Sequence, residues 1–146
     1  MTHEDAGNYA GKRHGAKLNK MIAAKIKEKI SENTIPCAEA HSIAAELNAD
    51  PADVGTAIDL LGVRINKCQL GLFGWGKKPN HGKDIHAADS VSVEMKCALE
   101  EVAEDGVVTC AALWVIANRL GAERKVVSAA CDTLSLKIRV CQLGAF

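Results

Sequence analysis

Aromatic side chains are scarce in this sequence, where Phe, Trp and Tyr together make up 3% of 146 residues. Proteins that hold single-stranded nucleic acid stack its bases on aromatic rings, so the scarcity argues against that class. Long apolar runs are lacking as well, and none approaches the roughly 18 residues that a membrane span requires. The N-terminus lacks the basic and then apolar pattern of a secretory signal. These absences predict a cytoplasmic protein without a membrane partner.

An excess of charge of either sign is also lacking. The chain has 18 Lys and Arg and 18 Asp and Glu, which gives a net charge of zero. Such a balance argues against a protein that coats nucleic acid electrostatically, although it leaves room for a local basic patch. The sequence contains no phosphate-binding loop, no nucleophile with a matched base and no paired carboxylates in a recognisable setting. We therefore expect neither enzymatic activity nor a cofactor.

The sequence instead contains an internal repeat. Shifting the chain by 73 residues aligns Cys37 with Cys110 and, further on, the run Cys-Gln-Leu-Gly-x-Phe at 68–73 with the same run at 141–146. A match of this length without a gap indicates a tandem duplication. The predicted organisation is a basic mobile arm over 1–17, a first unit over 18–73, a linker over 74–90 and a second unit over 91–146.

Each unit is predicted to contain three helices and short strands. Apolar residues spaced by four at 18–30 and 91–103 indicate a first helix. Second helices are expected over 37–47 and 110–120, and third helices over 51–61 and 124–134. Alternating residues at 63–66 and 136–139 predict short strands, which 34–36 and 107–109 can pair with. The alternation breaks after these strands, which predicts a turn or bulge near Lys67.

Two Asn/Gly exchanges between the units predict left-handed backbone at helix ends. Asn33 aligns with Gly106, and Asn48 aligns with Gly121. Asn and Gly are the residues that best tolerate a positive φ, so a matched exchange at two positions indicates a conformation that both units require.

The second and third helices of each unit, joined by a tight turn over 43–54 and 116–127, resemble the helix-turn-helix motif. The small residues Ala44 and Ala117 allow close helix crossing, and Val54 and Val127 anchor the third helix in the core. With the leading helix and the trailing strand, each unit resembles a winged-helix domain. The fold class is therefore expected to be mainly α with short β-strands, as a tandem repeat of two winged-helix-like three-helix units.

This resemblance implies a DNA-binding transcriptional regulator whose third helix contacts double-stranded DNA. The first unit suits that role poorly, because 37–73 carries a net charge of −3. The second unit has cations on its third helix and strand, and a wing is possible only after the first repeat. The candidate DNA-binding residues are Arg124, Lys125, Ser128, Lys137 and Arg139, with Lys12 and Arg13 of the arm, Thr56 of the first unit, and Lys77 and Lys78 of the wing.

Two alternatives remain open. Winged-helix folds also serve as protein-binding modules, so the acidic first unit and the repeated Cys-Gln-Leu-Gly turns could bind a protein partner. The turns are more readily explained as closing each small core. Cys37, Cys68, Cys110 and Cys141 form matched pairs and are weak candidates for a metal or iron–sulfur sensor, since zinc-type Cys-x-x-Cys spacing is missing. Because units of about 56 residues are marginally stable alone, a shared interface or a homodimer is expected.

Overall fold

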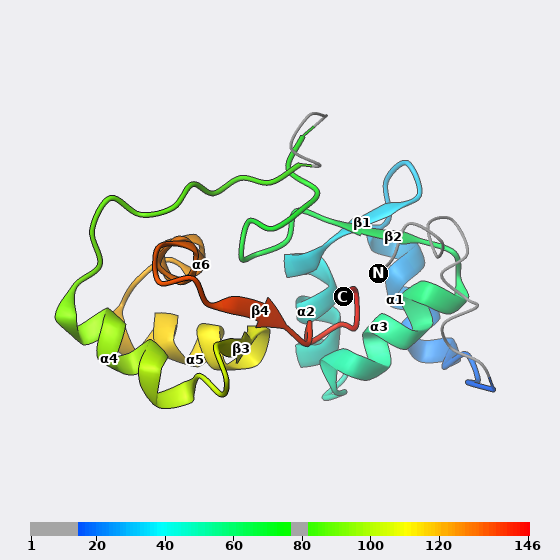
Figure 1. The fold of residues 1–146 in the computed structure, drawn as a ribbon. Coiled ribbons are helices and arrows are strands. Elements are labelled where there is room, and N and C mark those ends of the chain that lie inside the picture. The colour runs from blue at the N-terminus through cyan, green and yellow to red at the C-terminus, as the bar shows by residue number, and fades with distance from the viewer. Residues whose placement is uncertain (1–14, 77–81) are drawn as a thin grey trace. The chain divides into compact units, whose positions relative to one another are not determined.

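The computed structural model describes residues 15–76 and 82–146. Within these ranges the protein is mainly helical with a few short strands, as the sequence predicts. The first half contains α1 (Lys20–Lys29), β1 (Thr34–Pro36), α2 (Cys37–Glu46), α3 (Pro51–Leu60) and β2 (Arg64–Asn66). The second half repeats this order with α4 (Val93–Val102), β3 (Val107–Thr109), α5 (Cys110–Leu120), α6 (Arg124–Thr133) and β4 (Lys137–Arg139) (Figure 1).

The leading helices begin at matched capping residues. The Asn19 side chain accepts hydrogen bonds from the backbone N–H groups of Met21 and Ile22, and the Ser92 hydroxyl accepts one from Met95. Asn and Ser satisfy N–H groups that a helix start leaves without intrahelical acceptors. Since Asn19 and Ser92 are 73 residues apart, the start of each unit is encoded at the same repeat position.

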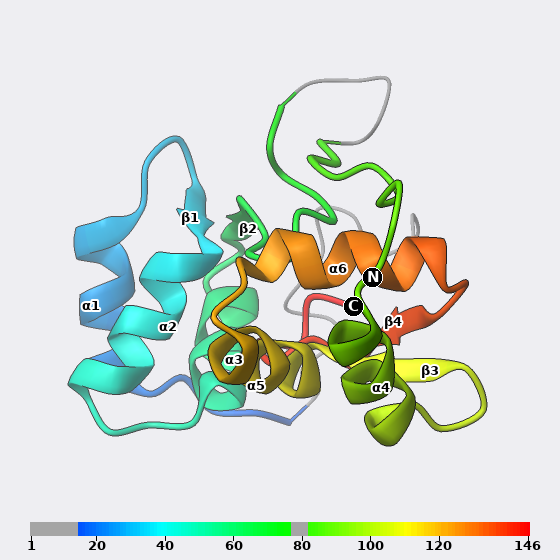
Figure 2. The ribbon, with the colours of Figure 1, turned by 90° about the vertical axis from the view of Figure 1, so that its left-hand side faces the viewer.

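The strands pair in parallel within each half. β1 pairs with β2 in the register Ile35 to Ile65, and β3 pairs with β4 in the register Val108 to Ile138. Figures 1 and 2 both show β1 beside β2. A parallel pair requires a crossover connection, which two helices supply here in each case. The partner strands expected from the sequence are thus confirmed.

The backbone repeats even where the residues differ. Asn33 and Gly106 have φ values of 61° and 76°, and Asn48 and Gly121 have 51° and 63°, so the predicted positive φ is confirmed at both exchanges. Asn48 and Gly121 do follow a helix end, whereas Asn33 and Gly106 lie in the turns that precede β1 and β3. The turn predicted near Lys67 is present, with φ of 48° at Lys67 and 58° at its counterpart Val140. A β-branched valine is strained at positive φ, so tertiary packing must hold the turn in the second half.

The chain forms two compact units that do not end where the sequence repeat ends. Unit 1 comprises Met1–Cys68 together with Gln142–Phe146, and unit 2 comprises Gln69–Cys141. The residues after each last cysteine, 69–73 (the first tail) and 142–146 (the second tail), therefore belong to the unit built from the other repeat. The tails close a core as the sequence suggests, but each closes the core of the opposite repeat.

One leucine of each tail is fully buried in this way. Leu143 joins the core of unit 1, and Leu70 joins that of unit 2. The cores themselves correspond position by position, as the following matched pairs show: Ile22 and Met95, Ile26 and Leu99, Ile35 and Val108, Ile43 and Ile116, Val54 and Val127, Ile58 and Cys131. Because the tail leucines lie in the cores, they do not form an exposed surface for a partner.

Gly55 on α3 fixes the seat of the second tail. A Cβ atom at this position would lie 1.8 Å from the carbonyl oxygen of Leu143, so the tail backbone passes directly over the glycine. The counterpart in unit 2 is Ser128, which has a Cβ and is fully buried. The first tail therefore cannot pass as close to α6 as the second tail passes to α3.

We expect Gly55→Ser, which installs the counterpart residue, to destabilise unit 1. The new Cβ and hydroxyl would displace the tail backbone at a cost of about 1–3 kcal/mol. Each kcal/mol lowers the Tm of a domain this small by roughly 4–8 °C. Calorimetry against Gly76→Ala, whose added Cβ meets open space, is the appropriate comparison. Equal melting temperatures for the two variants would contradict the close approach.

Candidate functional site

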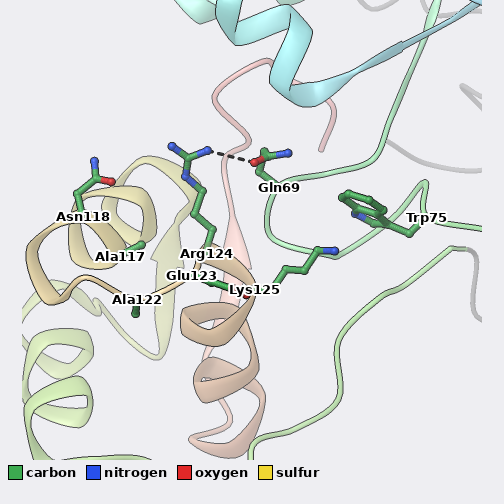
Figure 3. Close-up of a pocket in the computed structure, with 8 residues that line it drawn as sticks. All are labelled: Gln69, Trp75, Ala117, Asn118, Ala122, Glu123, Arg124 and Lys125. Carbon is green, nitrogen blue, oxygen red and sulfur yellow. Dashed lines mark hydrogen bonds between the residues drawn. The ribbon is translucent and has the colours of Figure 1, made fainter.

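The turn between α5 and α6 brings two cations to the start of α6. α5 ends at Gly121, whose left-handed φ of 63° lets the chain reverse, and the N–H of Ala122 donates to the Ala117 carbonyl. Glu123 occupies the N-cap position of α6 without a side-chain capping hydrogen bond, and Arg124 and Lys125 are the first two residues of the helix. The turn thus directs both cationic side chains away from the unit 2 core, into a pocket (Figure 3).

Arg124 lies between an aromatic ring and an amide. Its guanidinium carbon is 3.5 Å from the centroid of the Trp114 ring on α5. One guanidinium nitrogen donates a hydrogen bond of 3.2 Å to the Gln69 side-chain oxygen, drawn as the dashed line in Figure 3. Among the described residues, Arg124 forms no ion pair with a carboxylate. In the described part of the chain, a ring face and an amide dipole are the contacts that offset its charge.

Lys125 is held by a second tryptophan and by an acid. Its Nζ lies 3.5 Å from the centroid of the Trp75 ring and 2.5 Å from a carboxylate oxygen of Asp84. The Trp75 N–H donates a hydrogen bond to the Gly82 carbonyl, two residues before Asp84. Lys125 thus differs from Arg124 in having a carboxylate partner.

These side chains surround a pocket of about 420 Å³ within unit 2 (Figure 3). Four of its side chains are cationic or amide groups, and an indole ring forms another part of the wall. The lining residues are Gln69, Trp75, Ala117, Asn118, Ala122, Glu123, Arg124 and Lys125. The volume lies within the range of small-ligand pockets, in which a few convergent polar groups orient the ligand.

The same place in unit 1 has different chemistry. The repeat aligns Arg124 with Pro51, Lys125 with Ala52 and Asn118 with Ala45. His41 stands where unit 2 has Trp114. The shared helical frame therefore forms without the cations, the amide or the tryptophan, which are additions confined to unit 2.

A segment over 83–89 lies along α6 and covers part of its length. The Ala88 N–H donates to the Ala129 carbonyl, and the Thr133 hydroxyl donates to the Ala88 carbonyl at 2.6 Å. Lys83 forms an ion pair with Asp132 at 3.1 Å. With the ion pair between Asp84 and Lys125, the contacts of this segment reach from the first turn of α6 to its last.

The other residues predicted to contact DNA have different environments. Lys137 and Arg139 are exposed on β4. Thr56 is partly buried, and its hydroxyl donates to the Ala52 carbonyl of its own helix. Lys12, Arg13, Lys77 and Lys78 lie outside the described residues.

Ser128 is not an exposed contact, contrary to the expectation. It is completely buried, and its hydroxyl has no hydrogen-bond partner among the described atoms. The residue lies one position after the buried Val127, on the side of α6 that faces the core. A helix side chain in that position cannot reach a ligand outside the unit.

The cysteines are thiols, with none in a disulfide. Pro36 pairs with Asn66 in the parallel sheet. Cys37 follows Pro36 by one residue and Cys68 follows Asn66 by two, so the two cysteines leave the sheet at the same end, as the sequence suggests. Cys110 is likewise near Cys141, since its N–H donates to the Val140 carbonyl. In the described part of the chain, no three His, Cys, Asp or Glu residues converge as metal ligands would.

No protein-family model, curated protein or solved structure matches the chain. Over the described residues, no helix combines the length and the apolar character needed to cross a bilayer.

Thiol reactivity is expected to follow burial. Cys97 is exposed on α4, whereas Cys131 is enclosed in the α6 core. Burial, with a smaller contribution from the Asp132 charge, raises the pKa of the Cys131 thiol to about 12. Because the thiolate is the reactive form, iodoacetamide at pH 8 should label Cys97 well before Cys131. Peptide mass spectrometry measures both rates, and equal rates in the folded protein would refute this assignment.

Proposed function

We propose that the protein binds double-stranded DNA through its second unit, as a regulator built on winged-helix-like units. The three helices and the α5–α6 turn support the proposal. Ala117 and Val127 are buried, as the helix-turn-helix resemblance requires. The resemblance rests on these helices and not on a wing.

The cations at the start of the third helix, which unit 2 has and unit 1 lacks, carry the proposal. Arg124 and Lys125 occupy the first turn of the helix that would face DNA, and Lys137 and Arg139 are exposed on the strand of the same unit. The corresponding helix of unit 1 begins with Pro51 and Ala52 and offers no cation in its first turn. Positive side chains at a helix start are suited to contacting phosphate oxygens.

The covering segment restricts how α6 could meet a duplex. Base reading by a helix lying in the major groove requires several exposed turns. Because 83–89 lies along α6 from Lys125 to Thr133, the helix does not expose several turns to a duplex, so phosphate contacts would dominate. Such contacts position a protein on DNA without reading sequence, which predicts strong salt dependence and weak sequence preference.

Fluorescence anisotropy with a mixed-sequence duplex at several salt concentrations tests this function. Each phosphate contact contributes about −0.9 to the slope of log K against log salt. We expect Arg124→Ala combined with Lys125→Ala to weaken binding and to reduce the magnitude of the slope by about 2.

Arg64→Ala combined with Lys67→Ala is the matched control, because it removes the same charge from exposed positions of unit 1. This control should leave the slope nearly unchanged. Equal effects of the two double variants, or no binding of the wild-type protein at low salt, would contradict DNA binding through unit 2.

A further inference from the structure

We propose that the unit 2 pocket binds a small organic anion, with a carboxylate or phosphate group of the ligand on Arg124. This inference goes beyond DNA binding, since it concerns a soluble ligand of low molecular mass. The pocket volume of about 420 Å³ lies within the range of small-ligand sites.

Arg124 supplies the recognition of the anion. Its guanidinium is planar and has five N–H donors, of which the structure occupies one with Gln69. Stacking on Trp114 fixes the plane of the guanidinium. Since no described carboxylate pairs with Arg124, the fork geometry that matches an oxyanion in a bidentate pair is available to a ligand.

The remaining walls restrict the ligand. Gln69 and Asn118 place amide groups on the pocket wall, and the Trp75 indole flanks it (Figure 3). Glu123 also lines the pocket, and Asp84 already neutralises Lys125. The anionic group therefore fits best against Arg124, with the less polar remainder of the ligand toward Trp75.

The side chains of the pocket that are particular to unit 2 are not required for folding, because unit 1 folds in the same way without them. Unit 1 builds the same frame with Ala45, Pro51 and Ala52 in the corresponding positions. Four changes to larger or charged residues in unit 2, at 114, 118, 124 and 125, converge around one place. Convergence of this kind is expected of a site that was adapted to a ligand.

The two tryptophans of the protein both belong to this site, so intrinsic fluorescence reports on it directly. The probes are sodium phosphate and sodium acetate, each titrated in the absence of DNA against sodium chloride of equal ionic strength. We expect a saturable change of tryptophan emission with one of the two anions, with half-saturation at about 1–10 mM for so small a probe. Saturation with phosphate indicates a phosphate-bearing ligand, and saturation with acetate indicates a carboxylate.

Arg124→Lys retains the charge but loses the planar fork, and it should raise the half-saturating concentration at least fivefold. Arg119→Ala, at an exposed position of α5 outside the pocket, should leave the titration unchanged. Circular dichroism establishes whether each variant is folded. If Arg124→Lys does not fold, Asn118→Ala takes its place as a variant with weakened anion binding. Absence of saturation with both anions, or identical titrations for wild type and the folded site variant, would overturn the proposal. Because duplex DNA is not present, this result is independent of the anisotropy experiment.

Discussion

The contact on which much of the architecture depends is the passage of the Leu143 backbone over Gly55. It seats the second tail in unit 1, where Leu143 completes a core that the first repeat does not complete by itself. The first tail is seated in unit 2 in the reciprocal way, although Ser128 prevents an equally close approach. Each unit therefore needs residues from both repeats. A duplicated chain in which the tails are exchanged in this way is expected to fold more cooperatively than two independent small domains.

The exchange also builds the candidate site. Gln69 is the first residue of the first tail, and its side chain accepts the hydrogen bond from Arg124 of the second repeat. Trp75 follows the same tail and lies under Lys125. The site thus combines groups that precede the second repeat with groups inside it. The matching place in unit 1 has a tail glutamine, Gln142, but neither the cations nor the tryptophan. This asymmetry makes unit 2 the functional candidate for both DNA phosphates and a small anion.

Much of the fold could be predicted from the sequence because it depends on local rules. Helical spacing located the helices, the Asn/Gly exchanges located residues of positive φ, and the internal repeat supplied each prediction twice. The exchange of the tails could not be predicted, since Leu70 and Leu143 are equally suited to either core. Ser128 was placed on the wrong side of α6 because the register of a helix against its core depends on packing. Arg124 and Lys125 were identified as candidates, but Trp75 and Gln69 were missed, as they reach the site only through the tail. The one available indication was that neither tryptophan is matched by a tryptophan in the other repeat.

Hydrogen–deuterium exchange on Leu143→Ala tests the tail exchange most directly. The substitution removes a buried side chain from the second tail and should cost about 2–5 kcal/mol where that tail is seated. The tail assignment predicts that amides of α1, α2 and α3 lose protection while those of α4, α5 and α6 largely keep theirs. Loss of protection confined to α4, α5 and α6, as expected if each repeat closed its own core, would contradict it.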